Sequence, residues 1–194
     1  MKKIWEREMW MVLGFLVGCF ALGLLGGILF ANLAYPWRNG QNQMMELYAL
    51  TQIKNKKGKS AEYFWYLLEN RMFAVAFFQL TGLTGAARFI VVVAAAWMGF
   101  LAGAAGSLLI LEQGIRGFWI FAGSLFPQMI VYFPAVALLM TKIYKERGNI
   151  WKKPVKVIKI YLLTGTAAIF LCLAGVVLEA YVHPVWMRWL LEHV

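Results

Sequence analysis

Apolar residues in this chain gather into five long runs separated by short polar stretches. The runs cover about residues 9–35, 64–83, 87–111, 117–141 and 157–182. A transmembrane helix needs about 20 apolar residues, so each run is long enough to cross a bilayer. The pattern predicts an all-α, polytopic integral membrane protein with about five transmembrane segments, forming a single membrane domain over residues 1–194.

Two polar stretches complete this organisation: an outward loop at 36–63 and a basic loop at 142–156. Within the first, apolar residues at helical spacing predict a short surface helix over 43–53. The second run carries Glu69-Asn70-Arg71 and becomes fully apolar only at Met72–Leu80. An alternative therefore stays open in which Met72–Leu80 dips into the membrane and returns, leaving four full spans.

The fourth run contains the most costly residues for a span: Pro127, Gln128 and Pro134. Each proline lacks a backbone donor and crowds the carbonyl four residues earlier, so the helix is expected to break or kink. In hydrocarbon the freed carbonyls, near residues 123–124 and 130–131, need partners within the protein. The amide of Gln128 is placed to bond such a carbonyl or a neighbouring span. The alternative is a kinked span whose only role is shape.

Small residues mark two helix-packing faces. In the third run Ala95, Gly99, Gly103 and Ser107 recur every four positions and form one smooth face. The first run carries the pairs Gly14/Gly18 and Gly23/Gly27, which also permit close approach of another helix. Glycine is common in membrane helices, so these spacings leave open whether several copies of the chain assemble.

Composition agrees with a membrane location. The chain is 62% hydrophobic and 14% charged, against about 45–50% and about 25% in soluble domains. Its net charge of +10 would suggest nucleic acid in a soluble protein, but here the basic residues flank apolar runs. Membrane lipid and topology explain them better, and no nucleic-acid partner is expected. Cys19 and Cys172 both lie in apolar runs, which favours packing roles over a disulfide or zinc site.

Residues that carry catalytic chemistry are scarce. The chain has no Asp, and His183 and His193 stand near its end without a serine-histidine-acid arrangement or metal-ligand spacing. We therefore expect no enzymatic activity, no metal and no cofactor. Glu179, followed by Pro184, is the one acid near the end of a span; its position favours an anchor that reaches the interface. No charge is evident near the midplane, where an ion-coupled transporter usually needs one.

Two stretches resemble stage II sporulation protein M, a membrane protein family of endospore-forming bacteria. The first is Leu125-Phe126-Pro127-Gln128 with Pro134-Ala135, similar to the family's Leu-Pro-Gln/His core and following proline. The second is Glu179-Ala180-Tyr181-Val182 with Pro184, similar to its glutamate-aromatic-proline ending of the last span. The order of apolar runs also fits, so the resemblance covers roughly residues 9–191, without a matching signature in the first loop or in residues 60–85.

The resemblance implies a non-enzymatic scaffold in the cell membrane that acts in sporulation engulfment. Such a protein recruits peptidoglycan-degrading partners, stage II sporulation proteins D and P, to the septal and engulfing mother-cell membrane. The structural or partner-binding candidates are then Pro127, Gln128, Pro134, Glu179, Pro184, Gly99, Gly103 and Ser107. Family members also occur outside sporulation, and a small membrane transporter or channel subunit is the alternative function.

The distribution of basic residues predicts the orientation of the chain. With the N-terminus inside and five spans, eleven Lys and Arg residues lie on inside stretches and eight on outside ones. The C-terminus is then outside, so a reporter active only outside the cell should be active when fused after Val194. Activity of a cytoplasmic reporter alone at that position would contradict five spans and favour four.

Overall fold

The computed structural model describes residues 2–38, 60–126, 128–146 and 154–193. The surface helix predicted at 43–53 and much of the basic loop 142–156 lie outside these ranges. Every regular element within them is a helix. The elements are α1 (Lys2–Ala34), the 3-10 turn η1 (Tyr35–Arg38), α3 (Ser60–Thr81), α4 (Ala87–Gln113), α5 (Ile115–Leu125), α6 (Met129–Glu146), α7 (Val155–Val177), the π-helical turn η3 (Leu178–Val182) and α8 (His183–His193).

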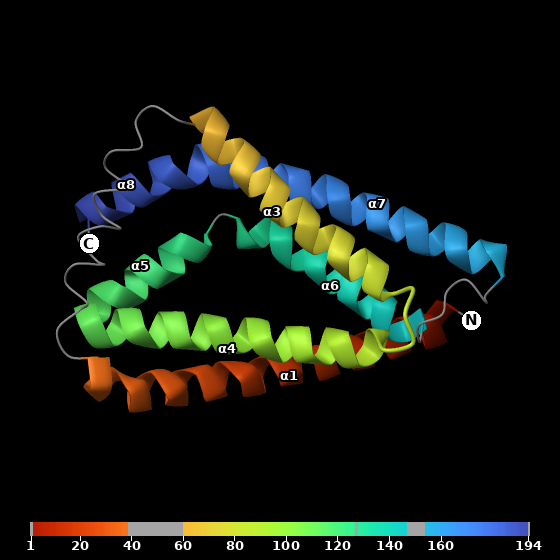
Figure 1. Cartoon of the computed structure of the whole chain (residues 1–194), viewed down its shortest axis with the longest axis horizontal. Helices are drawn as coiled ribbons and strands as arrows, with labels where there is room; N and C mark the ends of the chain where they lie inside the picture. Colours follow the sequence, from red (N-terminus) through yellow and green to blue (C-terminus); the bar gives the residue numbers. More distant parts are fainter. Residues whose placement is uncertain (1, 39–59, 127, 147–153, 194) are drawn as a thin grey trace.

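The helices run back and forth along the long axis of the molecule (Figure 1). The N-terminus, the α3–α4 turn, the end of α6 and the start of α7 lie toward one end. The end of α1, the α4–α5 turn and the C-terminus lie toward the other end. The α5–α6 pair returns along the bundle as one broken helix.

Within the described residues, three helices are long and apolar enough to cross a membrane: Met9–Ala34, Ala87–Gln113 and Val155–His193. The α5–α6 pair makes a fourth if it counts as one span, which is bent by 63° at the break. The chain is thus an all-helical protein of membrane character, with fewer apolar spans than the five predicted. The second predicted span, α3, is not among them, because Glu69, Asn70 and Arg71 near its centre lower its mean hydropathy.

The last helix is longer than the sequence predicted. The expected span ended near residue 182, yet α7, η3 and α8 form one apolar helix of 39 residues from Val155 to His193. Pro184 lacks the N–H that would bond the carbonyl of Ala180, and its ring crowds that carbonyl. The turn before it widens into a π-helix, in which the His183 N–H bonds the carbonyl of Leu178 five residues back. This widening lets the helix pass the proline instead of ending there.

Glycines bring α1 and α4 into backbone contact. A Cβ at Gly99 or Gly103 of α4 would overlap a backbone carbonyl of α1, at Phe20 and Leu24 respectively. A Cβ at Gly23 or Gly27 of α1 would likewise overlap a carbonyl of α4. The stripe on the third run and the second glycine pair of the first run therefore pack against each other. By contrast, a Cβ at Gly14 or Gly18 would meet nothing within 4 Å.

A polar contact extends this packing toward the end of α1. The side-chain N–H₂ of Asn32 donates to the Ile28 carbonyl at 2.8 Å and to the Ser107 hydroxyl at 3.1 Å. Ser107 is thus the polar end of the same small-residue face. An amide that bonds within the bundle avoids the cost of an unsatisfied polar group in lipid.

A glycine turn folds α5 back along α4. Gly114 has a φ of +61°, which L-residues with a side chain rarely adopt. A Cβ at Gly117 would overlap the backbone carbonyl of Leu109, so α5 starts in close contact with the end of α4. Further along, the ring of Phe126 packs against Trp186 of α8 at a centroid distance of 5.2 Å. These contacts hold α5 between α4 and α8.

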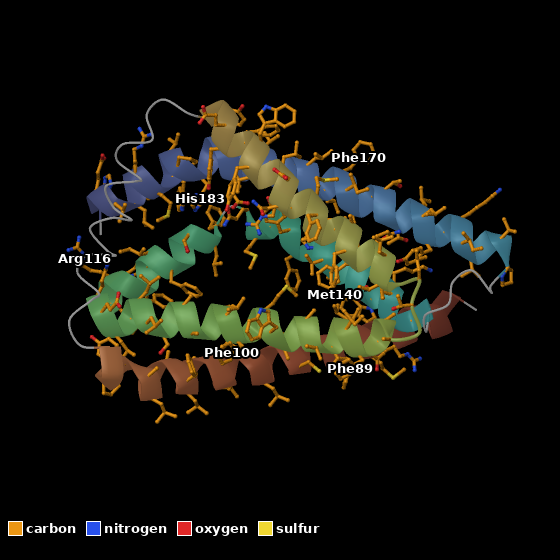
Figure 2. The ribbon with its side chains drawn as sticks, viewed as in Figure 1. Phe89, Phe100, Arg116, Met140, Phe170 and His183 are labelled. Atoms are coloured by element: carbon orange, nitrogen blue, oxygen red, sulfur yellow. The ribbon has the colours of Figure 1, made fainter. Side chains whose placement is uncertain are left out.

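Large apolar side chains cover the outside of the bundle. Phe170 on the outer side of α7 is 73% exposed (Figure 2), and Leu33 of α1 is 75% exposed. Buried residues form a core between α1, α4, α6 and α7, where Val91 and Ile143 are fully enclosed. An exterior of this kind suits hydrocarbon, where side chains need not be polar.

The glycine contacts give a prediction about stability. Gly99→Ala should lower the free energy of unfolding by about 1–3 kcal/mol, since the new methyl group forces α1 away from α4. Gly14→Ala is the matched control and should leave stability unchanged or slightly higher, because its surroundings are open. Thermal unfolding of both purified variants in detergent measures the difference. Equal stability of the two would show that α1 and α4 are not in backbone contact.

Candidate functional site

Charged and polar side chains from three helices meet beside the α5–α6 break. The guanidinium of Arg71 on α3 donates to both carboxylate oxygens of Glu179 on η3, with the shortest N–O distance 2.9 Å. The hydroxyl of Tyr132 on α6 donates to Glu179 Oε2 at 2.8 Å. Both oxygens of Glu179 are therefore occupied. This group is called the Glu179 cluster below.

The surrounding packing holds the Glu179 cluster in place. Gly175 lies one turn before Glu179, and a Cβ there would overlap the ring of Tyr132. The guanidinium carbon of Arg71 lies 5.1 Å from the centre of the same ring, a cation–π arrangement. Leu67 and Val176 are buried in the apolar cluster that packs around Tyr132. Glu179 itself is 7% exposed, so its carboxylate is shielded from the outside by protein.

At the break, two side chains form hydrogen bonds with the same backbone carbonyl. Gln128 Nε2 donates to the Ser124 carbonyl at 3.0 Å. His183 Nε2 lies 3.1 Å from the same oxygen; because a carbonyl only accepts, this nitrogen carries the proton and donates. Of the two roles that the sequence left open for Gln128, the structure has the one within its own segment. The link to a neighbouring helix comes instead from His183.

Two buried polar atoms near the break have no hydrogen-bond partner in the described part of the chain: Gln128 Oε1 and Trp186 Nε1. Trp186 lies next to Gly123 in space. Gln128 offers an acceptor and Trp186 a donor, so this side of the break retains unused hydrogen-bonding capacity.

The Glu179 cluster lies away from both ends of the bundle. Arg71 is near the middle of α3, and Glu179 is five residues past the midpoint of the 39-residue last helix. Figure 2 shows nitrogen and oxygen atoms gathered beside the labelled His183, away from both ends of the molecule. The sequence placed Glu179 near an interface and saw no charge at mid-depth. In the structure the helix continues past residue 182 to His193, so Glu179 does not lie at a helix end.

The structure distributes the predicted site residues over two places. Gln128, Glu179 and Pro184 belong to the break and its neighbours, whereas Pro127 lies outside the described residues. Pro134 lies inside α6, which continues through it. Gly99, Gly103 and Ser107 are separate from this site and face α1 of the same chain.

The two stretches that carry the family resemblance come together in space. Ser124, just before the first stretch, accepts from His183 beside Pro184, and Tyr132 within it donates to Glu179. Residues about 50 positions apart in the sequence thus form one site.

Sequence reasoning missed Arg71, Tyr132 and His183 as members of the site. A usable signal existed for Arg71. It is a basic residue in the middle of a helix, and Glu179 is an acid within another helix, so each is the other's natural partner in a membrane. The two residues are 108 positions apart, and no sequence pattern predicts that they are in contact, because the contact depends on how the helices pack.

Within the described residues there is no group of three or more His, Cys, Asp or Glu side chains that could hold a metal ion. Comparison of the chain with models of protein families, with curated proteins and with solved structures gave no match.

The Glu179 cluster gives a prediction about the Tyr132 hydroxyl. Tyr132→Phe removes one donor to Glu179 and keeps the ring, so we expect a loss of about 0.6–1.7 kcal/mol in stability. Tyr181→Phe is the matched control; Tyr181 lies on the same π-turn but is 53% exposed. Unfolding of the detergent-solubilised variants compares the two. A Tyr132→Phe protein as stable as the control would mean that this hydrogen bond contributes nothing.

Proposed function

We propose that this chain is a non-enzymatic membrane scaffold whose helices provide a fixed frame for partner proteins. The observation that carries the proposal is the mutual satisfaction of the charges in the site. Glu179 accepts three hydrogen bonds from Arg71 and one from Tyr132, which leaves neither of its oxygens without a donor. A carboxylate held in this way ties helices together, whereas a substrate-binding or proton-transferring group needs a partner that it can exchange.

The cellular role that we propose follows from the family resemblance. The chain would act in sporulation engulfment, in the septal and engulfing membrane of the mother cell. It would recruit the peptidoglycan-degrading stage II sporulation proteins D and P. The two resembling stretches form one site through Tyr132–Glu179 and Ser124–His183, which supports a shared role for them. The alternative within this proposal is that the chain serves as the same kind of scaffold outside sporulation.

We propose five membrane crossings with the N-terminus inside and the C-terminus outside. The alternating course of α1, α3, α4, the α5–α6 pair and α7–α8 along the long axis supports this arrangement (Figure 1). The α3 crossing is the one that its own hydropathy does not favour. Its central charge, Arg71, is neutralised by Glu179, which lowers the cost of placing α3 in hydrocarbon.

A small transporter or channel subunit is the second candidate, and a specific observation favours it. The helix break lies inside the bundle and retains a buried acceptor at Gln128 and a buried donor at Trp186. Broken helices with free polar groups form substrate sites in transporters. Solute flux through the purified protein in liposomes would support this candidate and count against the scaffold.

The scaffold proposal gives a prediction about the break. Gln128→Leu leaves the Ser124 carbonyl with His183 as its remaining side-chain donor, so the protein should insert but pack less accurately and bind partners more weakly. Pro134→Ala supplies an N–H for the Ile130 carbonyl and should straighten α6. The double variant should lose more partner binding than either single one, since both changes alter the course of the α5–α6 segment.

Membrane level and co-purification of partner proteins measure these effects. Met129→Leu is the control, because Met129 is adjacent to Gln128, apolar and 40% exposed. If all variants keep the control's membrane level and partner yield, the break is only a tolerated kink.

A further inference from the structure

The position of Arg71 raises a question about how α3 enters the membrane. α3 has 22 residues, enough to cross, but it carries Glu69, Asn70 and Arg71 near its centre. The Asn70 side chain is satisfied locally by the Tyr66 carbonyl at 2.9 Å. A carbonyl of the same helix cannot balance the guanidinium of Arg71 in this way, because the guanidinium keeps its proton and its positive charge needs an anion. Its side chain is 44% exposed, so it faces the surroundings of the helix wherever Glu179 does not cover it.

Glu179, the anion that pairs with Arg71, lies near the C-terminal end of the chain and is therefore synthesised late. Glu179 follows Arg71 by 108 residues and lies in the long helix Val155–His193, which is apolar enough to cross a membrane independently. α3 is not. One member of the pair therefore sits in a helix that is apolar enough to cross a membrane by itself, and the other in a helix that is not.

We propose that the Arg71–Glu179 ion pair is a latch that holds α3 across the membrane, so that this helix depends on the last one for its crossing. The proposal rests on the five-crossing arrangement proposed above. α3 remains poorly inserted until η3 arrives with Glu179. The pair then removes the charge penalty, and the Tyr132 hydroxyl and ring fix its position at the α5–α6 break.

The latch predicts unequal effects of removing the two partners. Without Glu179, Arg71 stays charged in hydrocarbon and α3 loses its crossing. Without Arg71, α3 no longer carries its central positive charge, and the helix that holds Glu179 is apolar enough to cross by itself. An ion pair that only stabilises helix packing predicts a different pattern, in which loss of either partner lowers the amount of protein equally. Glu69 carries the same cost in all variants, so it cancels from the comparison.

Thiol labelling of the full chain in cells tests the latch. Gly85→Cys places a reporter in the exposed turn between α3 and α4, where a Cβ meets nothing within 4 Å. Glu192→Cys reports on the exposed C-terminal end. A membrane-impermeant maleimide is applied from outside, and the chain without an added cysteine gives the background from Cys19 and Cys172. The readout is the amount of full-length membrane protein in which residue 85 is protected.

Four chains decide the question. In the parent chain we expect residue 85 to be protected and residue 192 to be labelled. Glu179→Gln should lower the amount of protected protein at least about tenfold, since a central charge shifts the insertion ratio by roughly a hundredfold. Arg71→Leu should leave the amount near the parent value. The double variant Arg71→Leu/Glu179→Gln should restore at least half of it.

Three results would overturn the latch. They are an unchanged amount in Glu179→Gln, an Arg71→Leu loss as large as that of Glu179→Gln, and failure of the double variant to recover. Labelling of residue 85 in the parent chain would instead overturn the five-crossing arrangement on which the latch rests. Partner recruitment is measured separately, so failure of the scaffold function is distinguishable from both.

Discussion

The contact between Arg71 and Glu179 joins α3 to the last helix across 108 residues of sequence. A charged side chain at mid-depth in a membrane is costly, and hydrogen bonds to an opposite charge are the usual remedy. Here the carboxylate is 7% exposed and also accepts from Tyr132, so three helices are held at one point. Removal of Glu179 would leave the charge of Arg71 without its partner, so this contact constrains all three helices at once.

The opposite side of the bundle is held by a different principle. Between α1 and α4 the close contacts are backbone to backbone, made possible because Gly23, Gly27, Gly99 and Gly103 have no side chains. Such packing relies on dispersion contacts, because the hydrophobic effect does not drive helices together in lipid. Polar contacts on this side include Asn32 with the Ser107 hydroxyl and the Tyr35 hydroxyl with the Leu111 carbonyl. The α1–α4 pair is therefore held mainly by backbone packing, whereas the Glu179 cluster joins α3, α6 and the last helix through an ion pair and hydrogen bonds.

The break between α5 and α6 connects these two regions. In hydrocarbon each freed backbone group must find a partner within the protein. The Ser124 carbonyl receives two side-chain donors, Gln128 from its own segment and His183 from the last helix. A similar logic explains the π-turn before Pro184, where backbone bonds are rearranged and not lost. In both places the carbonyls near a proline keep hydrogen-bond donors within the protein.

The sequence alone determined the class of fold and the places where helices are disturbed. Apolar runs gave an all-helical membrane protein because hydrocarbon admits few other backbones, and the regular small residues marked the face that α1 covers. Pro127 and Gln128 located the break because proline's missing donor acts locally, whereas α6 continues through Pro134. Features that depend on neighbouring residues in this way can be predicted from the sequence.

Only the tertiary structure decided which distant residues meet. The sequence ended the last span near residue 182, although η3 carries the helix through Pro184 to His193. That continuation moves Glu179 from an expected interface to the inside of the bundle, where Arg71 and Tyr132 reach it. Partner choice across 108 residues depends on how whole helices pack, and no local pattern encodes it.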